Sequence, residues 1–273
     1  MRTIINGKEL ANTILAQCKE QIATLQVQPT LAVILVGDNA ASHLYVKIKE
    51  KACNEVGITI KKHIFKEATT EEIIQLINQL NNSEASGILV QLPLPEHLDK
   101  NKILSSIELK KDVDFLNPQH FGTLLTKNNA GPCTPQAIMR MFDAYKIDLK
   151  GKSVCIINHS NLIGKPLSLS LLKRYATVSV CHDQTKNLLQ YTKNADIIIS
   201  ATGVPNIITG NHVKDNVILI DAGISKVDGK IQGDIHTSAQ DRSSYFTKVP
   251  GGVGPMTVAL LIENITRSAK NGL

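Results

Sequence analysis

The sequence predicts an α/β fold with two domains, each built around a parallel sheet. Short apolar runs alternate with helix-like segments over most of the chain, and this alternation is typical of βαβ units. A chain of 273 residues is long enough for two domains. A second alternating series begins after Gly151, which indicates a domain boundary near the middle of the chain.

The first series contains three predicted strands and two predicted helices. Thr69-Thr70-Glu71-Glu72 is typical of a helix start, and Gly57 is typical of a helix end. We therefore expect strands at residues 31–36, 59–65 and 87–91, and helices at residues 41–56 and 69–80.

The second series follows Pro132-Cys133-Thr134-Pro135 and a predicted helix at residues 136–145. We expect strands at residues 153–157, 177–181, 196–200 and 217–221, a helix from the turn at 158–166 to residue 174, and a last helix at 257–270. The first domain is predicted to comprise residues 1–139 with the returning helix 257–273. Residues 140–256 are predicted to form a Rossmann-like domain.

Composition excludes several classes of protein. The apolar runs are too short to span a bilayer, and the N-terminus lacks the apolar core of a signal peptide. The net charge of +6 permits nucleic-acid binding, but the lysines are dispersed and aromatic residues make up only 4%. The five scattered cysteines form no C-x-x-C pair. We expect a cytoplasmic, reduced protein without a metal, a nucleic-acid partner or a membrane partner.

The turn after the strand at residues 153–157 is a candidate dinucleotide site. Backbone N–H groups at the start of the following helix could bind a pyrophosphate. The turn keeps only Gly164 of the G-x-G-x-x-G pattern, so an ordinary strand–helix connection is the alternative. Thr202-Gly203 and Gly223-Ile224 place small residues after two other strands, where ligands of open α/β sheets bind.

Asp183 follows the second strand of this series, nineteen residues after Gly164. A carboxylate at this place can accept a hydrogen bond from a ribose 2′-OH and repels a 2′-phosphate. The alternative is a solvated turn residue.

Tyr45 and Lys49 lie four residues apart, so on a helix they share one face. An aromatic ring beside an ammonium group can stack on a flat substrate and supply a proton or a positive charge. Gln91 and Asp114 follow the strand at 87–91, and a carboxylate there can bind the edge of a pterin or guanine ring. The alternatives are a solvated helix face and loop acids that balance nearby lysines.

Pro250-Gly251-Gly252-Val253-Gly254-Pro255 contains three glycines and two prolines. This density predicts a loop, because proline lacks an N–H and ordered glycine is entropically costly. We expect the backbone of this loop to approach a ligand closely, with a dinucleotide on one side of a cleft and a substrate on the other.

These motifs together resemble the bifunctional methylenetetrahydrofolate dehydrogenase/cyclohydrolase family. The resemblance runs in order over nearly the whole chain through Tyr45-Val46-x-x-Lys49, residues 87–95, Lys111-Asp112-Val113-Asp114, residues 132–135 and residues 250–257. It implies oxidation of 5,10-methylenetetrahydrofolate to the methenyl form with NAD(P)⁺, followed by hydrolysis to 10-formyltetrahydrofolate, in one-carbon metabolism.

The resemblance also implies roles for residues. Lys49 would activate water and move protons, and Gln91 would orient Lys49. Tyr45 would stack on the aminobenzoyl group, and Asp114 would anchor the pterin. The implied substrate-binding set is Tyr45, Lys49, Val90, Gln91, Leu92, Asp114, Gly251, Gly252 and Pro255. The implied cofactor-binding set is Asn158, His159, Ser160, Gly164, Lys165, Asp183, Thr202, Gly203, Ile224 and Gly254.

The chain departs from the family at two places. Phe115 stands where glycine is usual, and Leu116-Asn117 replaces Phe-His, which could reshape the pterin pocket. Asn158-His159-Ser160 replaces Gly-Arg-Ser and removes an arginine that often meets the NADP phosphate; with Asp183 this favours NAD.

NADP is nevertheless the cofactor that the resemblance implies, because Lys165, His159 and Lys186 could neutralise a 2′-phosphate. The resemblance further implies a homodimer and a folate substrate, with a polyglutamylated folate as an open alternative. A monofunctional dehydrogenase and a non-catalytic folate- or nucleotide-binding regulatory protein are the remaining alternatives.

Overall fold

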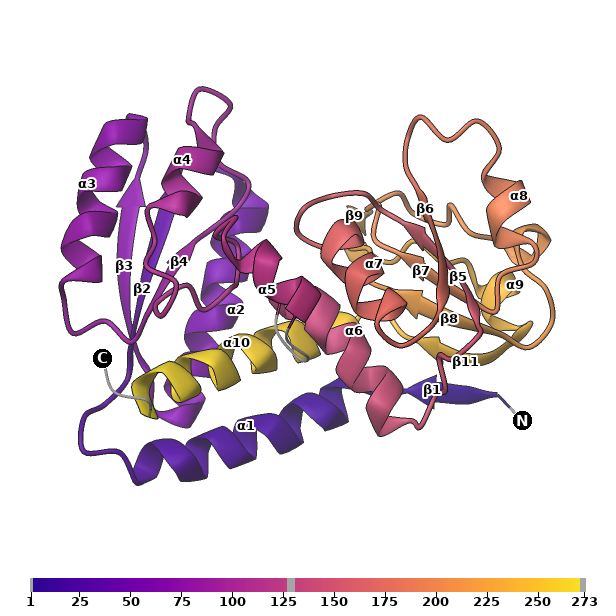
Figure 1. The fold of residues 1–273 in the computed structure, drawn as a ribbon, viewed down its shortest axis with the longest axis horizontal. Helices are drawn as coiled ribbons and strands as arrows, with labels where there is room; N and C mark the ends of the chain where they lie inside the picture. Colours follow the sequence, from indigo (N-terminus) through magenta and orange to yellow (C-terminus); the bar gives the residue numbers. More distant parts are fainter. Residues whose placement is uncertain (1, 127–130, 271–273) are drawn as a thin grey trace. The chain divides into compact units, whose positions relative to one another are not determined.

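The computed structural model describes residues 2–126 and 131–270, and the predicted α/β class is confirmed (Figure 1). The described residues form two compact units. Unit 1 comprises residues 1–11 and 124–257, and unit 2 comprises residues 12–123 and 258–273. The unit boundaries fall within helices α1 (Gly7–Ala23), α5 (His120–Thr126) and α10 (Val253–Lys270). The predicted functional domains, 1–139 with 257–273 and 140–256, stay a prediction.

Unit 2 is built on a parallel three-stranded sheet. Its order is β3-β2-β4, with β2 at Thr30–Val36, β3 at Thr59–Phe65 and β4 at Gly87–Val90. Helix α3 (Thr70–Asn81) packs on one face of this sheet (Figure 1), where its Ile73 and Ile77 join Ile34 and Ile88 in one core. The remaining helices are α2 (Ala40–Val56) and α4 (Lys100–Ser105).

The sequence signals for these helices act as predicted. Thr69 caps α3 through a capping box with Glu72, in which each side chain bonds the other's backbone N–H. Helix α2 ends at Gly57, whose φ of +91° is the left-handed conformation that favours glycine. The cap at Gly57 explains why the observed end of α2 agrees with the prediction, and the cap at Thr69 explains the same for the start of α3.

Unit 1 is built on a six-stranded parallel sheet. The order is β1-β11-β8-β7-β5-β6, with strands β1 (Thr3–Ile5), β5 (Ser153–Ile157), β6 (Thr177–Cys181), β7 (Ile197–Ser200), β8 (Val217–Asp221) and β11 (Ser243–Thr247). The sheet has a topological switch point at β5, because the next strand, β6, pairs with one edge of β5 and the strand after it, β7, pairs with the other edge. Such a switch point is where ligands bind in open α/β sheets.

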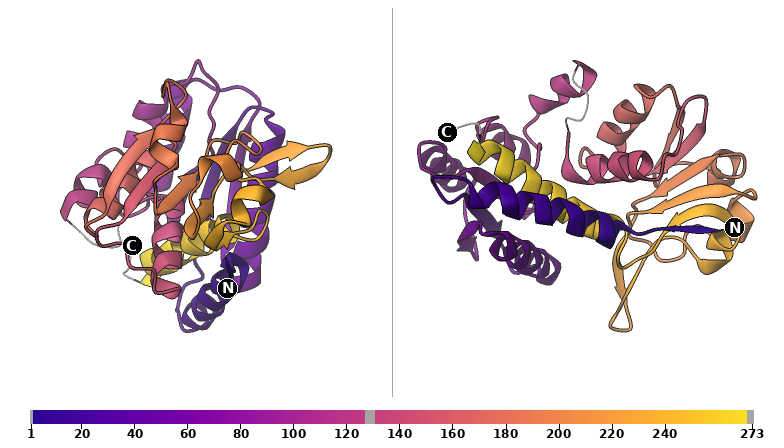
Figure 2. Two further views of the ribbon diagram at one scale, coloured as in Figure 1. Left: turned by 90° about the vertical axis from the view of Figure 1, so that its right-hand side faces the viewer. Right: turned by 90° about the horizontal axis from the view of Figure 1, so that it is seen from below.

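Helices and a hairpin complete unit 1. The helices are α6 (Cys133–Ala144), α7 (Gly164–Leu172), α8 (Leu188–Thr192), α9 (Thr237–Gln240) and a 3₁₀ turn at Gly210–His212. Strands β9 (Ser225–Val227) and β10 (Lys230–Gln232) form an antiparallel hairpin that projects from the sheet (Figure 2). The sequence analysis did not predict this hairpin.

The loop prediction for residues 250–256 was wrong in its second half. Helix α10 begins at Val253, so Gly254 and Pro255 lie in its first turn rather than in a loop. Backbone N–H groups of a first turn have no partner within the helix, so a proline there removes no helical hydrogen bond. All five cysteines are buried free thiols. Among residues 2–126 and 131–270, no helix is both long enough and apolar enough to cross a bilayer.

Candidate active site

Helix α2 carries Tyr45 and Lys49 in unit 2. Asn39 caps its first turn by accepting from the Ser42 N–H at 3.0 Å. Both Tyr45 and Lys49 are half-buried, and burial raises the pKa of the Tyr45 hydroxyl. The helix face that carries both residues is therefore partly buried, and it is not the fully solvated face that was the alternative interpretation.

Lys49 is joined to Gln91 across two elements. The Lys49 ammonium donates to Gln91 Oε1 at 3.0 Å. The other end of the Gln91 amide donates to the Leu92 carbonyl at 2.7 Å, which holds the oxygen toward the lysine. Gln91 is itself buried just after β4, and the neighbouring Val90 side chain lies in the core. A fixed acceptor thus holds Lys49 in one position.

Asp114 follows a buried segment beside β4. Asp112 forms a parallel bridge with Ile88, and Val113 accepts from Asn264 of α10 at 2.8 Å. Asp112 accepts from the Asn117 N–H at 2.7 Å, and burial raises its pKa to about 6. Asp114 is half-buried next to this segment. The loop that bears the predicted pterin anchor is therefore tied to β4 and to α10.

Phe115 adopts a left-handed backbone with a φ of +57°. This is the conformation in which glycine, the residue usual in the resembled family, has no steric penalty. The Phe115 ring lies 4.5 Å from the His120 ring, measured between centroids. Phe115 therefore occupies a backbone conformation that suits glycine, and its ring contacts His120.

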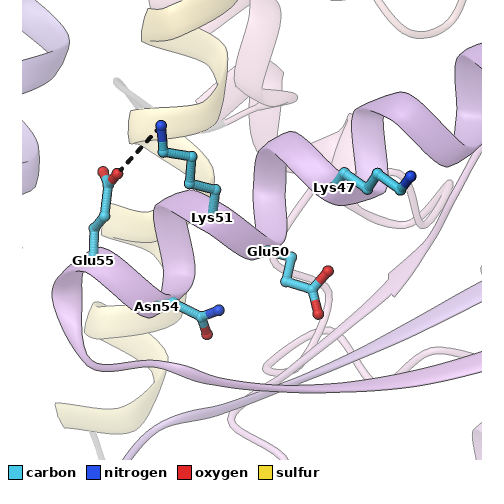
Figure 3. Close-up of a pocket in the computed structure, with 5 residues that line it drawn as sticks. All are labelled: Lys47, Glu50, Lys51, Asn54 and Glu55. Atoms are coloured by element: carbon cyan, nitrogen blue, oxygen red, sulfur yellow. Dashed lines mark ion pairs between the residues drawn. The ribbon is translucent and has the colours of Figure 1, made fainter.

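A shallow depression also lies along α2, but it is separate from these residues (Figure 3). It is lined by Lys47, Glu50, Lys51, Asn54 and Glu55. All five side chains come from one helix, and Lys51 and Glu55 form an ion pair across it at 3.9 Å. None of the predicted site residues lines it, so we do not assign it a ligand.

The turn after β5 differs from the predicted pyrophosphate cradle. Asn158 Oδ1 accepts from the Ser160 N–H at 2.9 Å and from the Gly164 N–H at 3.0 Å. The Ile163 N–H donates to Ser160 Oγ, and the Lys165 N–H donates to the Ser160 carbonyl. These amides of the α7 start are already bonded within the turn. A pyrophosphate would therefore meet the helix dipole and side chains here rather than free amides.

Gly164 is needed for packing. A Cβ at this position would lie 1.8 Å from the Asn158 carbonyl oxygen. This is the close helix–strand approach that the last glycine of a dinucleotide-binding turn permits.

Residues that follow β5, β7 and β8 lie near one another and near the start of α10. Asn158 Nδ2 donates to the Ala201 carbonyl at 2.7 Å and so joins the ends of β5 and β7. A Cβ on Gly203 would lie 3.7 Å from the Ile224 carbonyl oxygen, and one on Gly254 would lie 3.9 Å from Ile224 Cδ1. The predicted residues Gly203, Ile224 and Gly254 are thus brought together. An open backbone edge of this kind suits a dinucleotide.

Asp183 lies beyond β6 beside two histidines. The Asp183 side chain is 76% exposed, and its Oδ1 lies 3.7 Å from His182 Nδ1. A hydrogen bond from Gln184 lowers the pKa of Asp183. The His159 and His182 rings are 4.9 Å apart. One carboxylate and two imidazoles therefore lie together after β5 and β6, whereas Lys165 is bonded to Asn161.

The chain's own packing accounts for Gly252. A Cβ there would lie 2.6 Å from the Lys248 carbonyl oxygen, and one on Gly7 would lie 2.0 Å from the Gly252 carbonyl oxygen. Gly251 has a φ of +107° and open space at its Cβ position. Pro255 is half-buried in α10. Substrate contacts by these residues stay a prediction.

The sequence analysis missed two buried carboxylates of unit 1. Asp221 ends β8, and Asp234 follows the β9–β10 hairpin; both are 2% exposed or less. A charged residue at the end of the apolar run 217–221 was the signal available for Asp221, but no pattern around Asp234 indicated its burial.

Known proteins resemble this chain over its whole length. The model of the tetrahydrofolate dehydrogenase/cyclohydrolase catalytic domain matches residues 5–114, and the model of the NAD(P)-binding domain of the same family matches residues 132–273. The chain belongs to the tetrahydrofolate dehydrogenase/cyclohydrolase family.

Relatives in this family are similar in both sequence and structure. The bifunctional protein FolD of Nautilia profundicola is 46% identical over 98% of each chain. The crystal structure of the bifunctional FolD dehydrogenase/cyclohydrolase from Campylobacter jejuni is 47% identical over both full chains, with a TM-score of 0.96. The Trypanosoma brucei FolD complexed with NADP cofactor and inhibitor is 32% identical over 99% of this chain, with a TM-score of 0.94. Residues 132–273 thus match a nicotinamide dinucleotide-binding domain of this family.

Proposed function

We propose that this protein oxidises 5,10-methylenetetrahydrofolate with a nicotinamide dinucleotide and then hydrolyses the methenyl product to 10-formyltetrahydrofolate. The observation that carries the proposal is the match of both domain models of one bifunctional family to a single chain. The hydrogen bond between Lys49 and Gln91 supports it, because it holds an ionisable amine on the predicted substrate face.

The residues of unit 2 would divide the work on the folate. Tyr45 presents a half-buried ring on which the aminobenzoyl group stacks, and Asp114 accepts hydrogen bonds from the pterin. Lys49 moves the proton of the attacking water in the hydrolytic step, and Gln91 keeps its ammonium in place by accepting from it. A nicotinamide dinucleotide, when bound, would supply the hydride acceptor.

We propose NADP as the oxidant, with NAD as the alternative. Support for NADP comes from the family resemblance and from the imidazoles of His159 and His182 beside Asp183, which can bind a phosphate. Asp183 supports NAD, because its carboxylate suits a free ribose hydroxyl. A homodimer, a cytoplasmic location and a substrate with a polyglutamate tail are further proposals from the resemblance.

The test is a spectrophotometric assay of both steps. We expect reduced dinucleotide to form from 5,10-methylenetetrahydrofolate, and we expect methenyltetrahydrofolate supplied without dinucleotide to decay faster than in buffer. Oxidation without accelerated decay would indicate a monofunctional dehydrogenase. A protein that binds folate or dinucleotide but accelerates neither step would be a regulatory binding protein, and the proposal would be wrong.

A further inference from the structure

Asp234 is a fully buried carboxylate beneath the loop that follows β7. Its Oδ2 accepts three hydrogen bonds: from Ser200 Oγ at 2.7 Å, from the Thr202 N–H at 2.6 Å and from Thr202 Oγ1 at 2.9 Å. Thr202 Oγ1 in turn accepts from the Val204 N–H at 3.0 Å. One carboxylate oxygen therefore fixes both the backbone and the hydroxyl of Thr202, and through that hydroxyl the rest of the 202–204 loop.

Asp221 holds Asp234 and the neighbouring loop in the same way. Its Oδ1 accepts from the Asp234 N–H at 3.1 Å and from the Gly223 N–H at 3.0 Å, and its Oδ2 accepts from the Ile235 N–H at 2.9 Å. The 202–204 loop and the Gly223-Ile224 loop lie against each other beside the switch point. Two carboxylates thus set the shape of both loops.

Glycines make room for this pair of acids. A Cβ on Gly223 would lie 1.8 Å from Asp234 Oδ1, and one on Gly233 would lie 2.2 Å from Asp221 Oδ2. The arrangement is electrostatically unfavourable: burial, followed by the charge of Asp234 as a smaller contribution, raises the pKa of Asp221 to about 6. Asp234 Oδ1 has no hydrogen-bond partner among the described residues. Apolar side chains could connect these segments at a lower cost in folding free energy than two buried acids. We therefore look for the role of the two acids in the loops that they hold.

We propose that Asp234 is a positioning residue for the dinucleotide, which holds the 202–204 loop in the shape that binds the cofactor, and that Asp221 supports it by fixing Asp234 and the Gly223-Ile224 loop. This inference rests on the proposed function, because the two loops carry the predicted cofactor residues Thr202, Gly203 and Ile224. Neither acid needs to touch the dinucleotide.

The test compares Asp234→Asn with the matched control Asp196→Asn. Asp196 is likewise a carboxylate that accepts hydrogen bonds from other segments, from the Ser153 N–H at 2.8 Å and from Lys214 Nζ at 2.7 Å. It precedes β7 and so lies at the opposite end of that strand from Ser200. We expect Asp234→Asn to raise the Kd for NAD⁺ and NADP⁺ about tenfold, because it removes the charge that holds the loop. Titration calorimetry on the full-length variants measures this change.

A second measurement separates positioning from general damage. We expect KM for the dinucleotide to rise with Kd in Asp234→Asn, while the hydrolysis of methenyltetrahydrofolate without dinucleotide stays within about twofold of wild type. Asp196→Asn should leave both Kd values unchanged. A Kd for Asp234→Asn equal to that of the wild type, or an equal rise in Asp196→Asn, overturns the inference.

A further variant covers the case in which Asp234→Asn does not fold. Asp221→Asn keeps Asp234 and its three donors, and we expect a several-fold higher Kd for both dinucleotides; an unchanged Kd in this folded variant then overturns the inference. Failure of the proposed function is a different result, because the wild-type protein itself would then bind or reduce neither dinucleotide.

Discussion

At the scale of single residues, Lys49 differs from the other lysines of α2 in having a buried amide as its partner. We expect Lys49→Ala to lower the rate of methenyltetrahydrofolate hydrolysis by about 100-fold or more, because general acid–base groups contribute effects of this size. Lys51→Ala on the same helix is the control, since the Lys51 side chain is 81% exposed. A Lys49→Ala enzyme that hydrolyses at the wild-type rate would remove the assigned role.

Asp183 is the residue that decides between the two cofactors in this proposal. We expect Asp183→Ser to raise the ratio of kcat/KM for NADP to kcat/KM for NAD several-fold, because it removes a negative charge from beside the 2′-phosphate. Asp215→Ser is the matched control: Asp215 is 73% exposed and lies before β8, away from the carboxyl ends of the strands. An unchanged cofactor ratio in Asp183→Ser would show that this carboxylate does not meet the ribose.

Phe115 allows a test of backbone strain. A protein with glycine at a given position is normally less stable than the same protein with alanine there. At a φ of +57° this order should reverse. We expect Phe115→Gly to be more stable than Phe115→Ala by about 1 kcal/mol in urea unfolding, while both lose the contact with His120. Equal stability of the two variants would mean that the backbone relaxes at this position.

At the scale of elements, the turn between β5 and α7 depends on one missing side chain. We expect Gly164→Ala to destabilise the protein by about 2 kcal/mol or more, because its Cβ would overlap the Asn158 carbonyl. Gly122→Ala in α5 is the control, since nothing lies within 4 Å of its Cβ position, and there alanine should stabilise the helix. Thermal unfolding of both variants measures the difference; a Gly164→Ala midpoint equal to the wild type would contradict it.

The elements that the sequence predicted are those with a clear apolar pattern. Strands β5, β6 and β8 have the predicted bounds, and in β5 and β8 this follows from apolar runs that are mostly buried. Strands β9, β10 and β11 were missed because polar residues alternate irregularly with apolar ones there. Strands β9 and β10 pair with each other across Asp228-Gly229, a hairpin signal that the sequence analysis did not use. Strand β11 instead pairs with β1 and β8, which lie farther away in the sequence.

Helix α1 was missed although a signal was present. Asn6 accepts from the Glu9 N–H at 3.2 Å, and its amide donates to the Glu9 carboxylate. This is the spacing of a capping box with asparagine in place of Ser or Thr. The pattern Asn-x-x-Glu before an apolar periodicity could therefore have predicted the start of α1.

The candidate site was predicted only in part, because several of its contacts join segments that are distant in the sequence. Lys49 and Gln91 could be paired in advance because the family resemblance, through two separate motifs, implies that Gln91 orients Lys49. Asp234 and Ser200 are joined by a hydrogen bond between distant segments, which no local pattern encodes. The same holds for the internal bonding of the β5–α7 turn, which a glycine pattern alone could not reveal.

At the scale of the whole molecule, each unit contains one buried carboxyl group with a raised pKa among its described residues. The pKa of Asp112 in unit 2 and that of Asp221 in unit 1 are raised by burial from 3.8 to about 6. Folding therefore favours the protonated forms. The stabilisation is complete below the unfolded-state pKa near 3.8, and it is lost as the pH rises through about 6.

The direction of this pKa shift predicts that the stability of the wild type and that of Asp221→Asn depend differently on pH. As the pH rises from about 4 to about 7, the free energy of unfolding of the wild type should fall relative to that of the variant by about 2–3 kcal/mol. Urea unfolding of both proteins at several pH values measures the difference, and subtraction removes the carboxylates that titrate alike in both. A difference that stays flat over this range would mean that Asp221 is not buried as a charged group.

The pairing of β1 with β11 has a consequence for how the polypeptide reaches its native state. Thr3 and Tyr245 are partners in register although they lie far apart in the sequence, so β1 cannot join its sheet before the segment that contains β11 has been synthesised. Contacts of such large sequence separation are slow to form. Strand β1 therefore completes the edge of its sheet only after β11 is available, and until then its backbone must be kept from pairing elsewhere.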